Sequence, residues 1–202
     1  MKYKLTYETM TTESGVLLHR IECVESFGNI KEGDRGGWIE KEENLSQCGN
    51  CWVHGNAQVY GNARVSGNAW VYYNARVYGN ALVYGNAWVY SNARVYGNAE
   101  VYGNAQVYDN ARVYGNALVY GNAQVSEDAV ICNSNDYIVF KNNWSSFRHF
   151  TWTRSNDMWK VGCFYGTGKE LIEKAYKDSK LSGDCYKAYV ELVEKLKEQQ
   201  KQ

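Results

Sequence analysis

The chain has 202 residues, of which 45% are hydrophobic, so it is long enough to bury a core. Its 22 Lys and Arg residues equal its 22 Asp and Glu residues, which argues against a general attraction to nucleic acid or to a membrane surface. The sequence contains no transmembrane stretch and no apolar signal region after Met1, so we expect a cytoplasmic protein. In that compartment its six cysteines are expected to be thiols.

Residues 1–36 are predicted to form an N-terminal β cap. Two strands are expected, at about residues 3–7 and 16–27, and Gly28-Asn29 and Gly36-Gly37 are predicted to form turns after them. An all-parallel β-helix would expose an unpaired strand edge at each end, so terminal segments that differ from the repeat are expected there.

Residues 37–132 are predicted to form the central domain, because most of this segment is an exact repeat. The stretch from Gly49 to Cys132 divides into fourteen consecutive six-residue units with the consensus Gly-Asn-Ala-x-Val-Tyr. Two looser units precede them. A period of six with alternation inside the unit matches neither an amphipathic helix nor collagen.

Each repeat position has a structural interpretation. Ala and Val lie two residues apart, so both face the same side of a short strand, and we expect that side to be the core. The x and Tyr positions then point outward, and Gly-Asn forms a corner. Three units would complete one triangular coil, which places Asn56, Asn74, Asn92 and Asn110 in a ladder at one corner.

The repeat resembles the hexapeptide-repeat family of left-handed β-helices, in which a small residue follows an aliphatic residue by four positions, as in Val53/Ala57 and Val59/Ala63. The resemblance implies a mainly β fold, a left-handed parallel β-helix of about five coils. The handedness comes from the family and would depart from the usual right-handed crossover.

Residues 133–202 are predicted to form a small α+β module. Strands are expected at residues 137–140, 149–153 and 158–164. Thr167 and Glu170 form a predicted capping box that opens a helix, and a second helix is predicted to begin near Asp184.

Sorting the outward residues by coil gives three faces. The tryptophan face carries Trp52, Trp70, Trp88, Gln106 and Gln124; the arginine face carries Gln58, Arg76, Arg94, Arg112 and Val130, beside Tyr60, Tyr78, Tyr96 and Tyr114; the third face carries Arg64, Leu82, Glu100 and Leu118.

These ladders suggest a partner-binding surface. Trp, Tyr and Arg are enriched at binding hot spots, and large aromatic surfaces usually mark interaction sites. We therefore predict that a partner contacts Trp52, Trp70, Trp88, Arg76, Arg94, Arg112, Tyr78, Tyr96 and Tyr114. The alternative is that the ladders are purely structural, because repeats duplicate as blocks and aromatic residues favour strands. A protein partner is favoured over nucleic acid, because charges within the repeats offset one another.

The sequence contains no recognisable catalytic or metal site, and no cofactor is expected. Many proteins with this β-helix are acyltransferases, and of the three histidines only His54 lies in the repeats, so it is the sole candidate base. Cys48, Cys51 and His54 have metal-ligand spacing, but Cys51 occupies an inward small-residue position and is predicted to be a core cysteine.

The whole chain also resembles a family of phage and prophage proteins of Gram-positive bacteria. The matching stretches are Leu18-His19-Arg20-Ile21, Gly36-Gly37-Trp38-Ile39-Glu40, the repeats, Phe150-Thr151-Trp152-Thr153 and Gly162-Cys163-Phe164. The resemblance implies a phage accessory protein. We therefore predict a non-enzymatic binding protein in the cytoplasm of the bacterial host. We predict that it binds and inhibits a host protein complex such as a CRISPR or restriction system. The alternatives are a structural or self-assembling component, including a homo-oligomer, and a hexapeptide-repeat acyltransferase.

Overall fold

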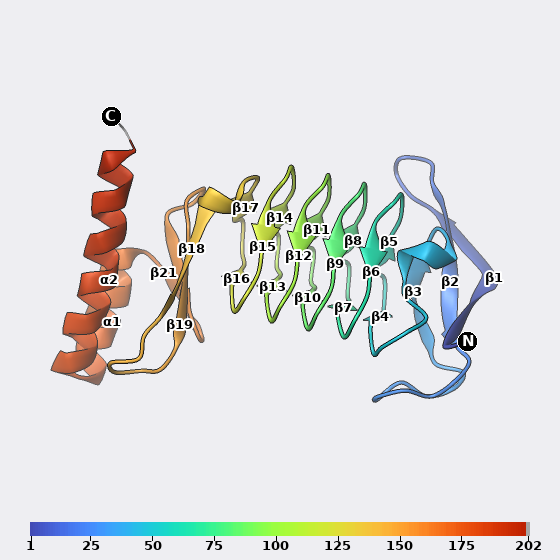
Figure 1. Ribbon diagram of the computed structural model, residues 1–202, viewed down its shortest axis with the longest axis horizontal. Coiled ribbons are helices and arrows are strands. Elements are labelled where there is room, and N and C mark those ends of the chain that lie inside the picture. Colours follow the sequence, from blue (N-terminus) through green and yellow to red (C-terminus); the bar gives the residue numbers. More distant parts are fainter. Residues whose placement is uncertain (201–202) are drawn as a thin grey trace. The chain divides into compact units, whose positions relative to one another are not determined.

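The computed structural model describes residues 1–200, which form two compact units, residues 1–136 and residues 137–200. The first unit is a parallel β-solenoid with an antiparallel cap at its N-terminal end, and Figure 1 shows its coils succeeding one another along the chain. The predicted parallel β-helix is confirmed. No helix among the described residues has the length and apolar character needed to cross a membrane.

Three parallel sheets form the faces of the solenoid. The tryptophan face consists of β4 (Trp52–Val53), β7 (Trp70–Val71), β10 (Trp88–Val89), β13 (Gln106–Val107) and β16 (Gln124–Val125). The arginine face consists of β5 (Gln58–Val59), β8 (Arg76–Val77), β11 (Arg94–Val95), β14 (Arg112–Val113) and β17 (Val130–Ile131). The third face consists of β6 (Arg64–Val65), β9 (Leu82–Val83), β12 (Glu100–Val101) and β15 (Leu118–Val119).

The predicted register, in which each unit stacks on the third unit after it, is confirmed on every face. Trp88 pairs with Trp70 and Gln106, and Arg94 pairs with Arg76 and Arg112. The Val and Ala positions of the repeats are buried inside the coils, as the alternation predicted. The predicted asparagine ladder is also present, because the side-chain amide of Asn56 donates to Asn74, Asn74 to Asn92, and Asn92 to Asn110.

The N-terminal cap continues the arginine-face sheet. β1 (Tyr3–Thr11) and β2 (Leu17–Cys23) form an antiparallel hairpin, and β3 (Arg35–Ile39) pairs antiparallel with β2 and parallel with β5. A short 3₁₀ helix, η1 (Glu42–Asn44), follows β3, and a second, η2 (Ser134–Asp136), follows the last coil. β3 therefore occupies the strand edge of the first coil at β5, and β2 occupies the other edge of β3, so neither of these edges is left unpaired.

The second unit is a four-stranded antiparallel sheet followed by two helices. Its elements are β18 (Tyr137–Lys141), β19 (His149–Thr153), β20 (Met158–Val161), β21 (Phe164–Gly166), α1 (Gly168–Asp178) and α2 (Lys180–Gln199). Phe150, Trp152 and Trp159 of the sheet share one core with Leu171, Val190 and Val193 of the helices.

Two boundaries of the second unit differ from the sequence prediction. The predicted strand at residues 158–164 is divided by a turn at Gly162, which has a φ of +56°. The second helix begins at Lys180 and not near Asp184, because Ser179 caps it by accepting a hydrogen bond from the backbone N–H of Ser182. The predicted capping box of Thr167 and Glu170 is confirmed.

The three corners of the coil differ in how much space they leave beside the backbone. At Gly85, which has a φ of +70°, an added Cβ would lie 3.0 Å from the backbone nitrogen of Gly103 in the next coil. At Gly55, which has a φ of +68°, the nearest atom would be the nitrogen of Tyr73 at 3.5 Å, an ordinary van der Waals contact. The corner after the tryptophan face can therefore hold side chains, whereas the corner at Gly85 cannot without a shift.

This difference predicts unequal effects of adding a methyl group at the two corners. Gly85→Ala is expected to lower the free energy of unfolding by about 1–3 kcal/mol, because it combines a left-handed φ with a tight backbone contact. Gly55→Ala, at a φ of +68° and with no atom of the next coil nearer than 3.5 Å to the added Cβ, is expected to lower it by about 1 kcal/mol, the cost of the left-handed conformation alone. Urea unfolding followed by circular dichroism measures both, and equal effects would contradict the assignment of a permissive corner.

Candidate functional site: an aromatic pocket beside His54

The solenoid unit contains a pocket of about 440 Å³ where the N-terminal cap meets the tryptophan face. Its lining residues come from the cap loop and from three successive coils: Asn29, Ile30, His54, Trp70, Tyr72, Tyr73 and Trp88. Small-molecule sites in proteins usually have volumes of about 300–1,000 Å³ and mostly apolar walls with a few polar groups. The pocket has that size and that character.

The cap loop forms one wall of the pocket and is held from beneath by Trp52. Phe27 and Ile30 exchange two backbone hydrogen bonds, of 3.0 and 2.9 Å, which close the loop. The Trp52 ring contacts Phe27 edge-on at 5.5 Å and Tyr3 at 6.2 Å. Trp52 is fully buried, so the prediction that it contacts a partner is wrong for this residue, because the cap covers it. Its role in the structure is to support the loop.

The other two tryptophans of the ladder remain accessible and form the apolar walls. Trp70 is half-buried, and Trp88 is 44% exposed. The Trp88 ring meets the Tyr72 ring edge-on, with 6.3 Å between centroids and 78° between planes. Tyr72 in turn stacks on Tyr90 at 4.8 Å, so the ladder fixes its ring. Two of the three predicted tryptophans are thus brought together in one pocket.

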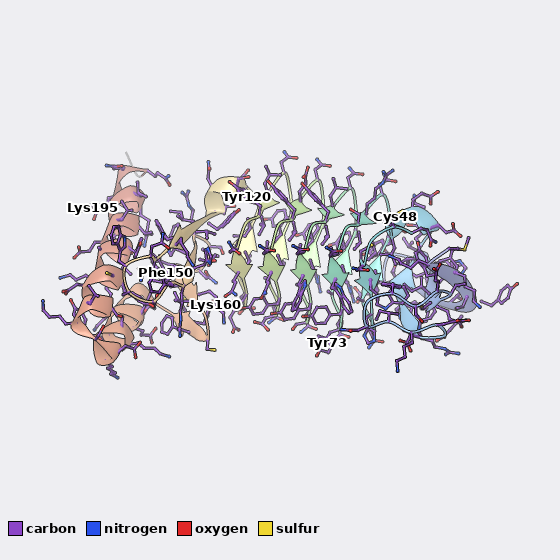
Figure 2. All side chains as sticks on the ribbon, turned by 60° about the horizontal axis from the view of Figure 1, so that its bottom comes forward. Cys48, Tyr73, Tyr120, Phe150, Lys160 and Lys195 are labelled. Atoms are coloured by element: carbon purple, nitrogen blue, oxygen red, sulfur yellow. The ribbon has the colours of Figure 1, made fainter. Side chains whose placement is uncertain are left out.

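Tyr73 extends the pocket over the permissive corner. It stands where the consensus has glycine, has a φ of +59° and is 62% exposed. Figure 2 shows it projecting from the edge of the coils. Ser91, Asp109 and Glu127 occupy the equivalent corner positions of later coils, also at positive φ. A non-glycine residue in this conformation carries a backbone cost that is typical of functional positions.

Sequence analysis did not identify Asn29, Ile30, Tyr72 or Tyr73 as site residues. The loop residues could not have been found, because nothing in the sequence shows that the cap folds over the tryptophan face. Tyr73 could have been found from the repeat, because it departs from the consensus. The consensus glycine is replaced at positions 73, 91, 109 and 127, which recur once in every three units. That period assigns the four exceptions to a single corner.

His54 supplies the basic group of the pocket. Its backbone N–H donates to the carbonyl of Val71 at 2.9 Å, which fixes the strand end from which the imidazole projects. The next residue, Gly55, accepts a 2.8 Å hydrogen bond from the Arg20 guanidinium. The His54 side chain is exposed, and its ring nitrogens have no hydrogen-bond partner within residues 1–200. An imidazole so placed is available to a ligand in the pocket as a proton acceptor.

The cap hairpin contacts only part of the arginine face. Arg76 forms a 3.2 Å ion pair with Glu13 at the hairpin tip, and the hydrogen bond from Arg76 holds the pKa of Glu13 below its usual range. Arg94 and Arg112 are exposed. Beside them Tyr60, Tyr78, Tyr96 and Tyr114 form a continuous stack with 5.0–5.1 Å between centroids. Binding of a macromolecular partner by Arg76, Arg94, Arg112, Tyr78, Tyr96 and Tyr114 stays a prediction.

The cysteines next to His54 are separated by burial. Cys51 is buried and its thiol contacts the Lys2 ammonium nitrogen at 3.3 Å, whereas Cys48 is exposed. Burial raises the pKa of the Cys51 thiol, while Lys2 acts in the opposite direction. Cys51 thus occupies the core position that the alternation predicted. Within residues 1–200 no three His, Cys, Asp or Glu side chains form a group that could hold a metal ion.

Comparison with known proteins assigns the repeats to a described type. Residues 57–73, 75–91, 93–109, 105–121 and 111–127 match the model of the YdcK β-solenoid repeat. The uncharacterized acetyltransferase YdcK of Escherichia coli (strain K12) is 34% identical to this chain over 79 residues, which cover 32% of this chain and 24% of the relative. The chain thus spans about a quarter of the length of the curated relative that it matches.

This similarity corrects two predictions from the sequence. The relative is named an acetyltransferase, which supports the acyltransferase alternative and not the prediction of a phage-encoded inhibitor of a host defence complex. The prediction that the chain is not an enzyme is contradicted by the same finding. No loop interrupts the fourteen repeat units, so the repeats by themselves do not form the wall of a pocket. The structure shows that the pocket wall comes from the cap loop.

The tyrosine ladders, which include the stack of Tyr84 on Tyr102 beside the third face at 4.9 Å between ring centroids, predict a loss of stability in alkali. Burial raises the pKa of Tyr72 and of Tyr84 to about 12, and Tyr60, Tyr78 and Tyr90 shift in the same direction for the same main reason. The unfolded chain ionises near pH 10, before the folded chain does, so the stability present below pH 10 is lost as the pH rises toward 12.

Urea midpoints measured between pH 8 and pH 12 test this expectation (about two pH units on either side of the ordinary tyrosine pKa). We expect a steep fall above pH 10, together with delayed formation of tyrosinate in the ultraviolet spectrum of the folded protein. If all tyrosines of the folded protein titrated together near pH 10, the ladders would not be protecting their hydroxyl groups.

Proposed function

We propose that the chain is an acyltransferase that uses the aromatic pocket as its acceptor site and His54 as its general base. The observation that carries the proposal is that His54, the one histidine of the repeats, lies in a pocket of ligand size with Trp70 and Trp88. The similarity to a protein named an acetyltransferase supports the choice of reaction and of the acetyl group.

The chemistry requires one proton acceptor next to an attacking group. The imidazole of His54 takes the proton from a hydroxyl or amino group of the acceptor, whose heteroatom attacks the carbonyl carbon of an acetyl thioester. The bond from that carbon to sulfur then breaks, and the acetyl group remains on the acceptor. The protonated His54 gives its proton to the leaving sulfur, which departs as the free thiol. The free ring nitrogens of His54 suit this role, because no other side chain has to be displaced first.

The remaining walls would bind and orient the acceptor. Trp70, Tyr72 and Trp88 provide flat apolar surfaces that pack against a ring or against the apolar face of a sugar. Asn29 adds a side-chain amide that can donate and accept hydrogen bonds. The acceptor class that fits these walls is a small cyclic molecule with a hydroxyl or amino group directed toward His54.

The proposal predicts a specific loss of activity in His54→Gln. The purified protein is incubated with acetyl-coenzyme A and a set of amino sugars and primary amines, and release of the free thiol is measured. We expect His54→Gln to lower the turnover rate by about 100-fold or more, the usual contribution of a general base, while the affinity for the acceptor changes little.

His149→Gln, on β19 of the second unit, is the matched control and should leave the rate unchanged. Urea midpoints verify that both variants are folded. If the wild-type protein released no thiol with any acceptor, the proposed activity would be wrong. If His54→Gln and His149→Gln reduced the rate equally, His54 would not be the base.

Tyr73 provides a second test, because its conformational cost and its position in the pocket can be separated. Tyr73→Gly and Ser91→Gly each remove a left-handed non-glycine residue from the same corner, so each should change the free energy of unfolding by no more than about 1 kcal/mol. Only Tyr73 lines the pocket. Acceptor affinity, measured from tryptophan fluorescence, should therefore fall in Tyr73→Gly and stay constant in Ser91→Gly. Equal affinities would remove Tyr73 from the site.

The relationship to phage proteins, the cytoplasmic location and self-association into a homo-oligomer all stay predictions. The proposed reaction is compatible with each of them, since acetyl thioesters are made inside cells and since trimers are common among acyltransferases that the repeat resembles. The mass of the protein in solution measures the last of the three.

A further inference from the structure

The arginine face carries a second cavity, which the proposed acyl transfer does not use. It has a volume of about 290 Å³ and is lined by Asn92, Arg94, Asn110, Arg112 and Asp128. All five residues belong to the last three coils of the solenoid unit, and the two asparagines are members of the ladder at the permissive corner. Four of the five lining side chains carry hydrogen-bond donors.

The two arginines are placed close together, and neither has a direct ion-pair partner within residues 1–200. Arg94 on β11 and Arg112 on β14 are direct partners in the parallel sheet, so their backbones lie about 4.8 Å apart and both side chains leave the same face. Like charges directly opposite each other destabilise a sheet. Arg76, the preceding member of the ladder, has Glu13 as a partner, but Arg94 and Arg112 make no ion pair within residues 1–200.

The asparagine ladder leaves donors beside this pair. The amide of Asn92 donates one N–H to Asn110 at 3.3 Å, and the amide of Asn110 donates one to Asp128 at 3.2 Å. A side-chain amide has two N–H donors, so one on each of these residues is not used by the ladder. Because the ladder holds both amides in place, their donors are oriented before any ligand arrives.

From this arrangement we propose that Arg94, Arg112, Asn92 and Asn110 bind the phosphoryl group of a small phosphorylated molecule. Guanidinium groups bind phosphate oxygens through paired, charge-assisted hydrogen bonds, and a dianion between two arginines replaces their repulsion by two attractions. The inference does not depend on acyl transfer. Nucleic acid is disfavoured as the source of the phosphate, because a duplex binder needs a longer basic stripe than two arginines in a chain with no net charge.

Asp128 allows a test in which binding should become tighter, because it is the one lining residue whose charge opposes an anion. It stands where the repeat has asparagine, at the end of the ladder, and its carboxylate accepts from Asn110. Asp128→Asn restores the consensus residue and removes one negative charge from the rim of the cavity. A site for phosphate should therefore bind more tightly in this variant, whereas a cation site would bind its ion more weakly.

The test is a calorimetric titration of the full chain with inorganic pyrophosphate at low ionic strength. We expect saturable binding that is weakened at least about 10-fold in the Arg94→Gln/Arg112→Gln double variant and strengthened several-fold in Asp128→Asn. Arg64→Gln is the matched control, because Arg64 is an exposed arginine of the third face whose strand partner is Leu82 and not another arginine. The Arg64→Gln variant should bind pyrophosphate with the affinity of the wild type.

Folding of the variants is checked by urea unfolding, where removal of the facing positive charges should not lower the midpoint. The inference is overturned if pyrophosphate does not bind, if Arg64→Gln weakens binding as much as the double variant, or if Asp128→Asn leaves the affinity unchanged. Preferential binding of a short DNA duplex over pyrophosphate would also overturn it, because that result would make the face a nucleic-acid surface.

Discussion

The rest of the structure depends on the in-register stacking of one coil on the next. Backbone N–H groups of each coil donate to carbonyl groups of the following coil, as from Arg94 to Ala111 and from Tyr96 to Val113, at 2.9 Å. Because the strands are parallel and in register, every outward residue meets its own equivalent at a fixed spacing of about 4.8 Å. For tyrosine this spacing allows ring stacking, for asparagine it allows an amide chain, and for arginine it produces repulsion. The same constraint therefore gives stability at some positions and a capacity to bind at others.

The sequence was sufficient to predict the solenoid, because its pattern is local and repeated. Alternation of Ala and Val with outward residues determines which side is buried, and the return of each face after three units determines which residues stack on one another. The asparagine ladder and the three faces follow from the sequence alone. The helix start at Lys180 could not, because the helical spacing of the apolar residues that follow does not show where the first turn is capped.

The candidate site was less predictable, because it depends on a contact between segments that are far apart in the sequence. Trp52 belongs to the tryptophan face by its position, yet the cap buries it, and no feature of the repeat distinguishes it from Trp70 or Trp88. Likewise His54 was recognised as an isolated base, but the wall opposite it comes from a loop in the cap. The aromatic pocket forms only where the non-repetitive cap folds onto the repeats, so neither segment alone predicts it.

The three-face periodicity also limits how the gene for such a protein can change in length. Duplication or deletion of three consecutive repeat units adds or removes one whole coil and leaves each later side chain above its former kind of neighbour. Insertion or deletion of a single unit also keeps the coil continuous, but it moves every later strand to the next face. Arginine and tryptophan would then stack within one sheet, and the ladders of identical residues would be interrupted. Length variants that keep both the aromatic pocket and the arginine pair should therefore differ from this chain by whole coils, inserted between the two sites or after them.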